Sequence, residues 1–259
     1  MQATIILGVG TLVGLFLGML LFLEAGRRIR LRKMAKDGEK VEAGLGVVEG
    51  ALFGLMGLVI AFTFSGAASR FDAKRHLIVE EANNIGTAYL RLDLLPEAAQ
   101  PQLREKFRLY VDARLESYRT LPTVAGVMPR METATELQQD IWKQSVAATR
   151  EATNPQAALL LLPALNAMID IANTRAMATQ LHPPPIIFAL LATLALVCSL
   201  LAGFGMAGGK THSWIHIVAF AAVLTITVYV IIDMEYPRVG FIRVDPFDQA
   251  LVDVRASMQ

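Results

Sequence analysis

The chain has 259 residues, of which 54% are hydrophobic, and its mean hydropathy is +0.46. Its formal net charge of +1 excludes the strongly basic balance that is typical of nucleic-acid-binding proteins. The single cysteine, Cys198, lies in an apolar stretch, so an intrachain disulfide is excluded and no zinc-type cysteine spacing exists. Several uncharged stretches of membrane length instead indicate a multi-pass membrane protein.

The first uncharged stretch, residues 3–23, is long enough to cross a bilayer as a helix. Because no basic segment precedes it, we interpret it as a retained transmembrane helix and not as a cleaved signal peptide. Glycines at a spacing of four residues predict a face that another helix approaches closely. These glycines are Gly10, Gly14 and Gly18.

A basic loop is predicted next, over residues 24–46. The positive-inside rule places this loop in the cytoplasm and the later soluble parts of the chain on the extracytoplasmic side. The second span then begins after Glu49, a carboxylate that is either interfacial or an ion ligand. The seven basic residues of the loop are Arg27, Arg28, Arg30, Arg32, Lys33, Lys36 and Lys40.

Residues 49–95 are predicted to form one long helix, because no proline interrupts them and apolar residues keep a helical spacing throughout. Its first part, residues 50–69, is uncharged and can cross the membrane. From Arg70 onward charges return, so the second part is predicted to project into water. Transmembrane helices 1 and 2 thus account for residues 1–69.

Two stripes run along the membrane half of this helix. The small stripe contains Gly50, Gly54, Gly57, Ala61, Ser65 and Ser69, and the bulky stripe contains Phe53, Met56, Ile60, Phe64 and Phe71. In one interpretation the small face packs within the bundle and the bulky face meets lipid. In the other, copies of the helix surround an axis and the bulky side chains form a hydrophobic constriction, with the Thr63 hydroxyl near its mouth.

The rest of the chain is predicted to be helical as well, since no segment alternates with a period of two. Residues 70–182 form a soluble insert, residues 183–232 a hairpin of transmembrane helices 3 and 4, and residues 233–259 a charged tail that packs along the insert. The fold class is therefore an all-α membrane protein with four transmembrane helices and a large helical insert between the second and third. Helices are expected in the insert at about 97–120, 131–152 and 156–181, with a loop at 122–129.

Catalytic signatures are absent from the sequence: there is no HExxH, GxSxG, P-loop or GxGxxG after a strand. We therefore predict no enzyme activity, no cofactor and no metal. Two polar patches in the insert are interpreted as solvated faces, or as charges that pair between helices. They consist of Glu80, Glu81, Asn83 and Asn84 on the projecting helix, and of Asp170, Asn173 and Arg175 on a later helix.

Two segments resemble a bacterial family of membrane proteins described as bestrophin-like. The first is GALFGLMGLVIAFTFSGAASRFDAKRHLIVEEANNIGTAYLRLDLLP, which contains Glu80, Glu81 and Asn83. The second, DMEYPRVGFIRV, is similar to the ending D-x-x-x-P-x-x-G-x-I-R-V of that family. Its matching positions are Asp233, Pro237, Gly240, Ile242, Arg243 and Val244.

More distantly, this architecture is similar to that of bestrophins, which are homopentameric ion channels with a pore lined by the second membrane helix. The similarity implies an oligomeric channel for small monovalent ions in the bacterial inner membrane, with lipid and further copies of the chain as partners and no nucleic acid. It also implies a cytoplasmic insert, whereas the charge rule places the insert outside. By this similarity Ile60 and Phe64 are the best gate candidates among the pore residues Phe53, Met56, Ile60, Thr63 and Phe64. The candidate ion-pathway charges follow from their signs: Glu49 and Asp233 would favour cations near a pore mouth, and Arg70 would favour anions.

The alternative function is a non-conducting membrane sensor or scaffold whose helical insert binds a partner. In that case the polar residues from Glu80 to Asn84 would form the partner surface.

Overall fold

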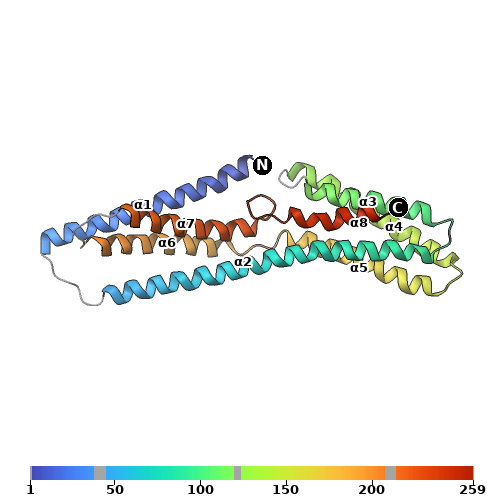
Figure 1. Ribbon diagram of the computed structural model, residues 1–259, viewed down its shortest axis with the longest axis horizontal. Coiled ribbons are helices and arrows are strands. Elements are labelled where there is room, and N and C mark those ends of the chain that lie inside the picture. Colours follow the sequence, from blue (N-terminus) through green and yellow to red (C-terminus); the bar gives the residue numbers. More distant parts are fainter. Residues whose placement is uncertain (1, 38–44, 120–123, 208–213, 259) are drawn as a thin grey trace. The chain divides into compact units, whose positions relative to one another are not determined.

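A computed structural model describes the backbone of residues 2–37, 45–119, 124–207 and 214–258, and within them the side chains of residues 10–36, 46–118, 132–207 and 214–258. The described residues contain helices and no strand. The α-helices, labelled in Figure 1, are α1 (Gln2–Asp37), α2 (Leu45–Leu90), α3 (Gln100–Arg119), α4 (Val124–Glu151), α5 (Gln156–Ala178), α6 (Pro185–Met206), α7 (Trp214–Glu235) and α8 (Gln249–Ser257). Two short 3-10 helices, η1 (Arg91–Leu94) and η2 (Asp245–Asp248), complete the described elements.

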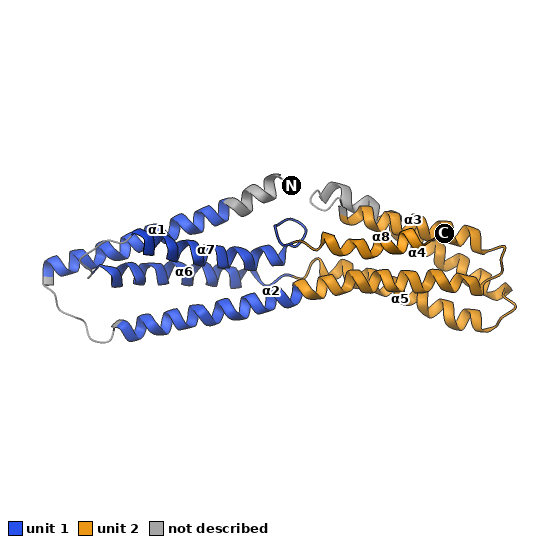
Figure 2. Ribbon diagram, viewed as in Figure 1, with its two compact units in different colours: residues 1–70, 182–242 blue, residues 71–181, 243–259 orange. Residues whose placement is uncertain are grey.

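The chain folds into two compact units (Figure 2). The first comprises Met1–Arg70 and His182–Ile242, and the second comprises Phe71–Leu181 and Arg243–Gln259. Helix α2 contributes its first part to one unit and its second part to the other. The tail is likewise divided, since its first ten residues belong to the first unit and the remainder to the second.

The first unit contains α1, the first part of α2, α6 and α7. Met19 and Leu23 of α1 pack against Ala195 of α6 and against Ile217 and Ala221 of α7 to form an apolar core. Helices α1 and α6 touch backbone to backbone in this unit. The contact is made at Gly26 of α1 and Gly203 of α6, which lie against the backbones of Leu200 and Leu23.

Among the described residues, four helices are long and apolar enough to cross a membrane, namely α2, α5, α6 and α7. Helix α5 nevertheless belongs to the second unit, where Leu161, Leu165 and Met168 are fully buried in the core. Its apolar character is thus explained by packing inside the helical insert. The helices of the first unit are α1, α2, α6 and α7, which are those predicted as the four membrane spans.

The second unit is a helical bundle with one large core. Phe107 and Tyr110 of α3 are its largest fully buried side chains, and Ile85 of α2 and Ile141 of α4 pack into the same core. Leu251 of α8 is also fully buried there. The end of the chain is therefore an integral part of this unit, which agrees with the predicted packing of the tail along the insert.

Three helix boundaries differ from the prediction. Helix α1 continues to Asp37, so most of the segment predicted as a basic loop is helical. Residues 27–37 contain neither glycine nor proline and are rich in arginine and lysine, which favour helices. Helix α4 already begins at Val124, inside the expected loop, and α7 ends at Glu235, one turn beyond the expected span. Residues 38–44, with Lys40, and the predicted turn at 208–213 lie outside the described residues.

Candidate functional site

The membrane half of α2 is the element on which the predicted pore residues lie. Met56 is buried against Leu194 and Cys198 of α6, and Phe53 and Ile60 pack around this cluster. The Phe53 ring also meets that of Phe220 on α7 edge to face, with 6.2 Å between the ring centres. The N-terminal part of the bulky stripe therefore packs against helices of the same chain.

The small stripe lies on the open side of α2. A Cβ atom placed on Gly50, Gly54 or Gly57 would have no other atom within 4 Å. Within the chain itself, the small face is therefore open and the bulky residues around Met56 pack inward, which contradicts the interpretation that the small face packs within the bundle and the bulky face meets lipid. Both stripes are visible in the sequence. The rotation of the helix, however, depends on how Met56 fits between side chains of α6, and residue spacing alone does not predict that fit.

The part of α2 around Thr63 and Phe64 is more exposed than the part around Met56. The single proton of the Thr63 hydroxyl is donated to the carbonyl oxygen of Val59 at 2.7 Å or shared with that of Ile60 at 3.0 Å, so the hydroxyl is satisfied within the helix. Phe64 is 44% exposed, because it is rotated away from the cluster around Met56. Only 6% of the most apolar stretch of α2 is buried inside the chain, which leaves a large apolar surface for lipid or for another subunit.

Charged residues converge where α7 ends. The Glu235 carboxylate is fully buried, and the Arg70 guanidinium binds both of its oxygens through Nε, at 2.9 and 3.1 Å. His182 Nδ1 lies 4.0 Å from the same carboxylate, and its ring stacks on Tyr236. Arg70, one of the expected ion-pathway charges, is thus held by a partner in its own unit.

Asp233, a second expected ion-pathway charge, closes the turn that follows α7. Its carboxylate accepts hydrogen bonds from the backbone N–H groups of Phe241 and Ile242, at 3.0 and 2.7 Å, and from the Tyr229 hydroxyl at 2.9 Å. A Cβ on Gly240 would lie 1.7 Å from an oxygen of this carboxylate, so only glycine fits at that position. The Asp233 and Gly240 positions of the tail motif are therefore explained by a carboxylate-capped turn.

Glu49, the third expected ion-pathway charge, is half-buried at the start of α2. Its carboxylate lies near Gly205 of α6, where an added Cβ would lie 3.8 Å from a Glu49 oxygen.

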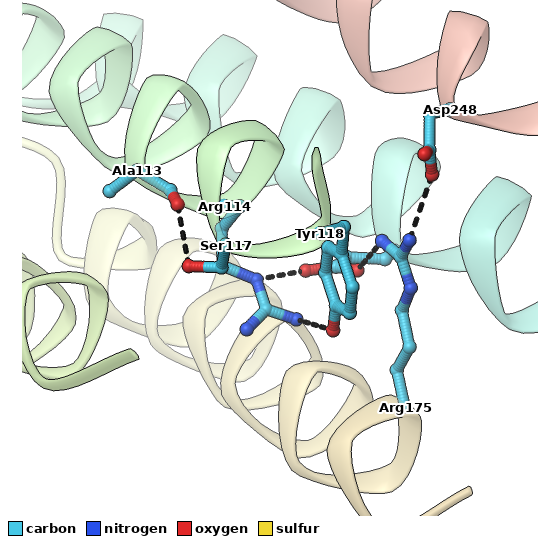
Figure 3. A network of polar contacts seen from close by, with 7 residues as sticks. Ala113, Arg114, Ser117, Tyr118, Arg175 and Asp248 are labelled. Carbon is cyan, nitrogen blue, oxygen red and sulfur yellow. Dashed lines mark hydrogen bonds and ion pairs between the residues drawn. The ribbon is translucent and has the colours of Figure 1, made fainter. Parts of the chain in front are cut away.

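A buried charge network occupies the second unit (Figure 3). Glu81 of α2 is fully buried and accepts hydrogen bonds from Arg114 of α3 and from Arg175 of α5, each at 2.5 Å. Arg175 also binds Asp248 of η2 at 3.0 Å, and Tyr118 lies between the two guanidinium groups. Two cations and two anions thus balance one another and join four separate segments of the chain.

The network determines the protonation of its members. Burial alone would raise the pKa of Glu81, but the charges of Arg114 and Arg175 overcome it and hold the pKa below its usual value. Burial raises the pKa of the nearby Tyr110, so this phenol stays protonated. The Glu81–Arg175 pair confirms the predicted pairing of charges between these helices. The role of Arg114 in this network was not predicted from the sequence. The available signal was that Arg114 is an arginine on an otherwise apolar helix face.

The remaining residues of the family motifs lie apart from this network. Glu80 and Asn83 are exposed on α2, while the Asn84 amide donates to the carbonyl oxygen of Ala167 at 3.4 Å. Arg243 is exposed and pairs with Asp245, two residues further along the chain. The patch from Glu80 to Asn84 is thus divided between a solvated face and contacts inside the bundle.

A comparison with models of protein families shows which family the chain belongs to. A model of the Bestrophin-like domain matches residues 13–248. The chain belongs to the Bestrophin-like family. No curated protein matches it. Membership confirms the resemblance that was based on the segment around α2 and on the tail.

Solved structures agree with this membership in the Bestrophin-like family. The chain is similar to two crystal structures of mutants of a bacterial bestrophin homolog from Klebsiella pneumoniae. One superimposes with a TM-score of 0.74 at 12% identity and covers 96% of both chains. The other has a TM-score of 0.70 at 13% identity and covers 95% of this chain and all of that one. At such low identity, the likeness shows that the fold is shared.

Proposed function

We propose that this Bestrophin-like protein is an oligomeric channel for small monovalent ions, with α2 lining the pore. The observation that carries the proposal is the exposure of the membrane half of α2, of which only 6% is buried inside the chain. A helix that is uncharged over residues 50–69 and presents a glycine-rich open face is suited to close contact with other helices in lipid. The shared bestrophin fold supports the same arrangement.

Phe64 is the first candidate for the constriction. Met56, Phe53 and Ile60 are engaged with α6 and α7, so they would support the pore wall from behind. Phe64 instead presents its ring on the exposed surface of the helix. An apolar ring at a narrow point hinders ions because it cannot replace their water of hydration.

Replacing Phe64 by alanine is expected to raise ion flux. The measurement uses purified protein in liposomes with opposing KCl gradients, and we expect the flux per inserted protein to rise by about threefold or more as the apolar constriction widens. The reversal potential in the same experiment reports whether cations or anions are conducted. The Ile60→Ala, Phe64→Ala pair tests whether the half-buried Ile60 adds to the effect.

Phe62→Ala is the matched control. Phe62 is 69% exposed on the same helix, but two residues correspond to a rotation of about 200°, so its ring faces another direction. Equal flux in the Phe64 and Phe62 variants would contradict a constriction at Phe64. No flux from any of these proteins at verified insertion would contradict the channel and favour the sensor or scaffold.

The basic end of the first unit faces the cytoplasm, so the helical insert is extracytoplasmic. Six described basic side chains of α1 lie close to one another in sequence beyond its apolar stretch, and the positive-inside rule supports this orientation. They are Arg27, Arg28, Arg30, Arg32, Lys33 and Lys36. The similarity to bestrophins implies the opposite orientation.

Reporter fusions in bacteria test this orientation. Alkaline phosphatase, which is active only outside the cytoplasm, is expected to be active when fused after Gln259 and inactive when inserted between residues 40 and 41. A cytoplasmic fluorescent protein fused at the same two sites should give the reverse pattern. Fluorescence from the fusion after Gln259 would place the insert in the cytoplasm.

A further inference from the structure

The last part of α1 carries a concentration of positive charge. Residues 24–37 contain six basic and two acidic residues, which leaves an excess of four positive charges. Because α1 is helical to Asp37, this segment has defined faces instead of the variable geometry of a loop. Its charges also suit the C-terminal end of a helix, where the helix dipole is negative.

One face of the segment is fixed against α6. Arg30 donates a hydrogen bond to the carbonyl oxygen of Phe204 at 3.3 Å, and its guanidinium lies 5.4 Å from the centre of the Phe204 ring. Gly26 is buried against the backbone of Leu200. The rotation of α1 is therefore set at this level, and so is the direction of its opposite face.

That opposite face combines cations with apolar side chains. Arg28, Arg32 and Lys36 are exposed and recur at intervals of four residues, so they form one stripe along the helix. Ile29 and Leu31 flank the stripe and are 50% and 41% exposed. Exposed apolar side chains beside cations are typical of a helix that lies at the boundary between lipid headgroups and acyl chains.

The position of the stripe favours a lipid over a soluble partner. Leu23, the last residue of the uncharged stretch of α1, precedes Arg28 by five residues, or about 7.5 Å along the helix axis. This distance is within the depth of the headgroup region when the apolar stretch is in the bilayer core. Arg32 and Lys36 lie about 13.5 and 19.5 Å beyond Leu23 along the axis, and their long side chains can extend back toward the headgroups. Part of the charge of Arg28 is engaged by Glu24 at 2.7 Å, so Arg32 and Lys36 are the two strongest candidate ligands.

We propose that the cationic stripe of Arg28, Arg32 and Lys36 binds the phosphate groups of anionic phospholipids. The apolar flanks pack on the first methylenes of the lipid chains, while the cations bind the headgroup. The site is separate from the ion pathway on α2, so the proposal stands independently of channel activity.

Native mass spectrometry of the detergent-purified full chain tests this site. Phosphatidylglycerol is titrated against phosphatidylcholine, and the Arg32→Gln, Lys36→Gln variant is compared with the Lys143→Gln, Arg150→Gln variant. Lys143 and Arg150 are exposed on α4, so the control removes the same charge from the second unit. We expect phosphatidylglycerol to bind about 30-fold more weakly to the stripe variant, since each basic residue near an anionic surface contributes about fivefold. Binding of phosphatidylcholine should be unchanged in both variants.

Two outcomes would overturn the proposal. Equal retention of phosphatidylglycerol by the stripe variant and by the control would remove the stripe from lipid binding. Displacement of the lipid by low millimolar inorganic phosphate would show a site for free phosphate instead of a lipid surface. An unchanged melting temperature of the stripe variant would establish that any lost binding comes from the removed charges and not from misfolding.

Discussion

Replacing Glu81 by glutamine is expected to lower the melting temperature of the second unit by about 10 °C, through a loss of about 3–5 kcal/mol in the free energy of unfolding. Glutamine has nearly the same shape but no charge. It would leave Arg114 and Arg175 buried with only Asp248 to balance them. An uncompensated buried cation is far more costly than the loss of one hydrogen bond, because its water of hydration is not replaced.

The measurement follows tryptophan fluorescence during thermal unfolding of the full chain in detergent. Trp142 of α4 packs against the core of the second unit, so a Trp214→Phe background makes it the sole tryptophan reporter. Glu80→Gln is the matched control, because Glu80 precedes Glu81 on the same helix but is exposed. A Glu81 variant that melts together with the Glu80 variant would contradict the structural importance of the network.

A second variant separates loss of charge balance from loss of contacts. Removing Arg114 together with Glu81 leaves Arg175 paired with Asp248, so the buried charge is again neutral. The Glu81→Gln, Arg114→Gln double variant is therefore expected to melt above the Glu81→Gln single variant. The effects of two independent contacts would instead add, and the double variant would then be the less stable protein.

The same network predicts a pH dependence. The folded-state pKa of Glu81 is lowered from 4.5, so its contribution to stability is present above about pH 4.5 and is lost as the pH falls through the folded-state value. Glutamine does not titrate. The gap in melting temperature between the natural protein and Glu81→Gln should thus be constant above pH 4.5 and narrow below it.

The elements of the fold were predictable because they depend on local composition. Uncharged stretches marked the helices of the first unit, and the unbroken apolar spacing after residue 49 predicted the single long helix α2. The proline-rich and charged boundaries separated the insert from the hairpin. The motif around Asp233 and Gly240 was visible as a pattern, although its function as a capped turn requires the geometry.

The contacts between elements were not predictable in the same way. Glu81 and Arg175 are separated by 94 positions, and Arg114 showed only as an arginine among apolar residues. Likewise, the rotation of α2 turns Met56 inward and the small stripe outward, opposite to what stripe composition alone favoured. Sequence spacing defines which residues share a face, but complementary partners elsewhere in the chain determine which way that face points.

The same limit applies to the glycines of α1. The predicted close-packing face contains Gly10 and Gly14, where an added Cβ would have no neighbour within 4 Å, and Gly18, where it would meet a Leu196 side chain at 3.3 Å. The tight contact instead involves Gly26, three residues after the uncharged stretch ends, and Gly203 of α6. The predicted close approach is thus present at Gly18, while the tightest contact of the helix lies further along, at Gly26.

Replacing Gly203 by alanine is expected to separate α1 from α6 and to destabilise the first unit by about 1–3 kcal/mol or more. The new Cβ would lie 1.9 Å from the carbonyl oxygen of Leu23, and 2.6 Å from its carbonyl carbon. These are backbone atoms, so no side-chain rotation can relieve the overlap. A Cβ on Gly26 would meet the carbonyl oxygen of Leu200 at 1.9 Å, so each helix needs glycine to receive the other.

Gly205→Ala provides the control, because it makes the same change two residues further along α6. Its Cβ would lie 3.8 Å from a Glu49 oxygen, an ordinary contact, and alanine is a better helix former than glycine. In a Trp142→Phe background, fluorescence of Trp214 at the start of α7 reports on the first unit, and the Gly203 variant should melt well below the Gly205 variant. Equal melting of the two would mean that α1 can shift without cost, and the backbone contact would then not hold the membrane helices together.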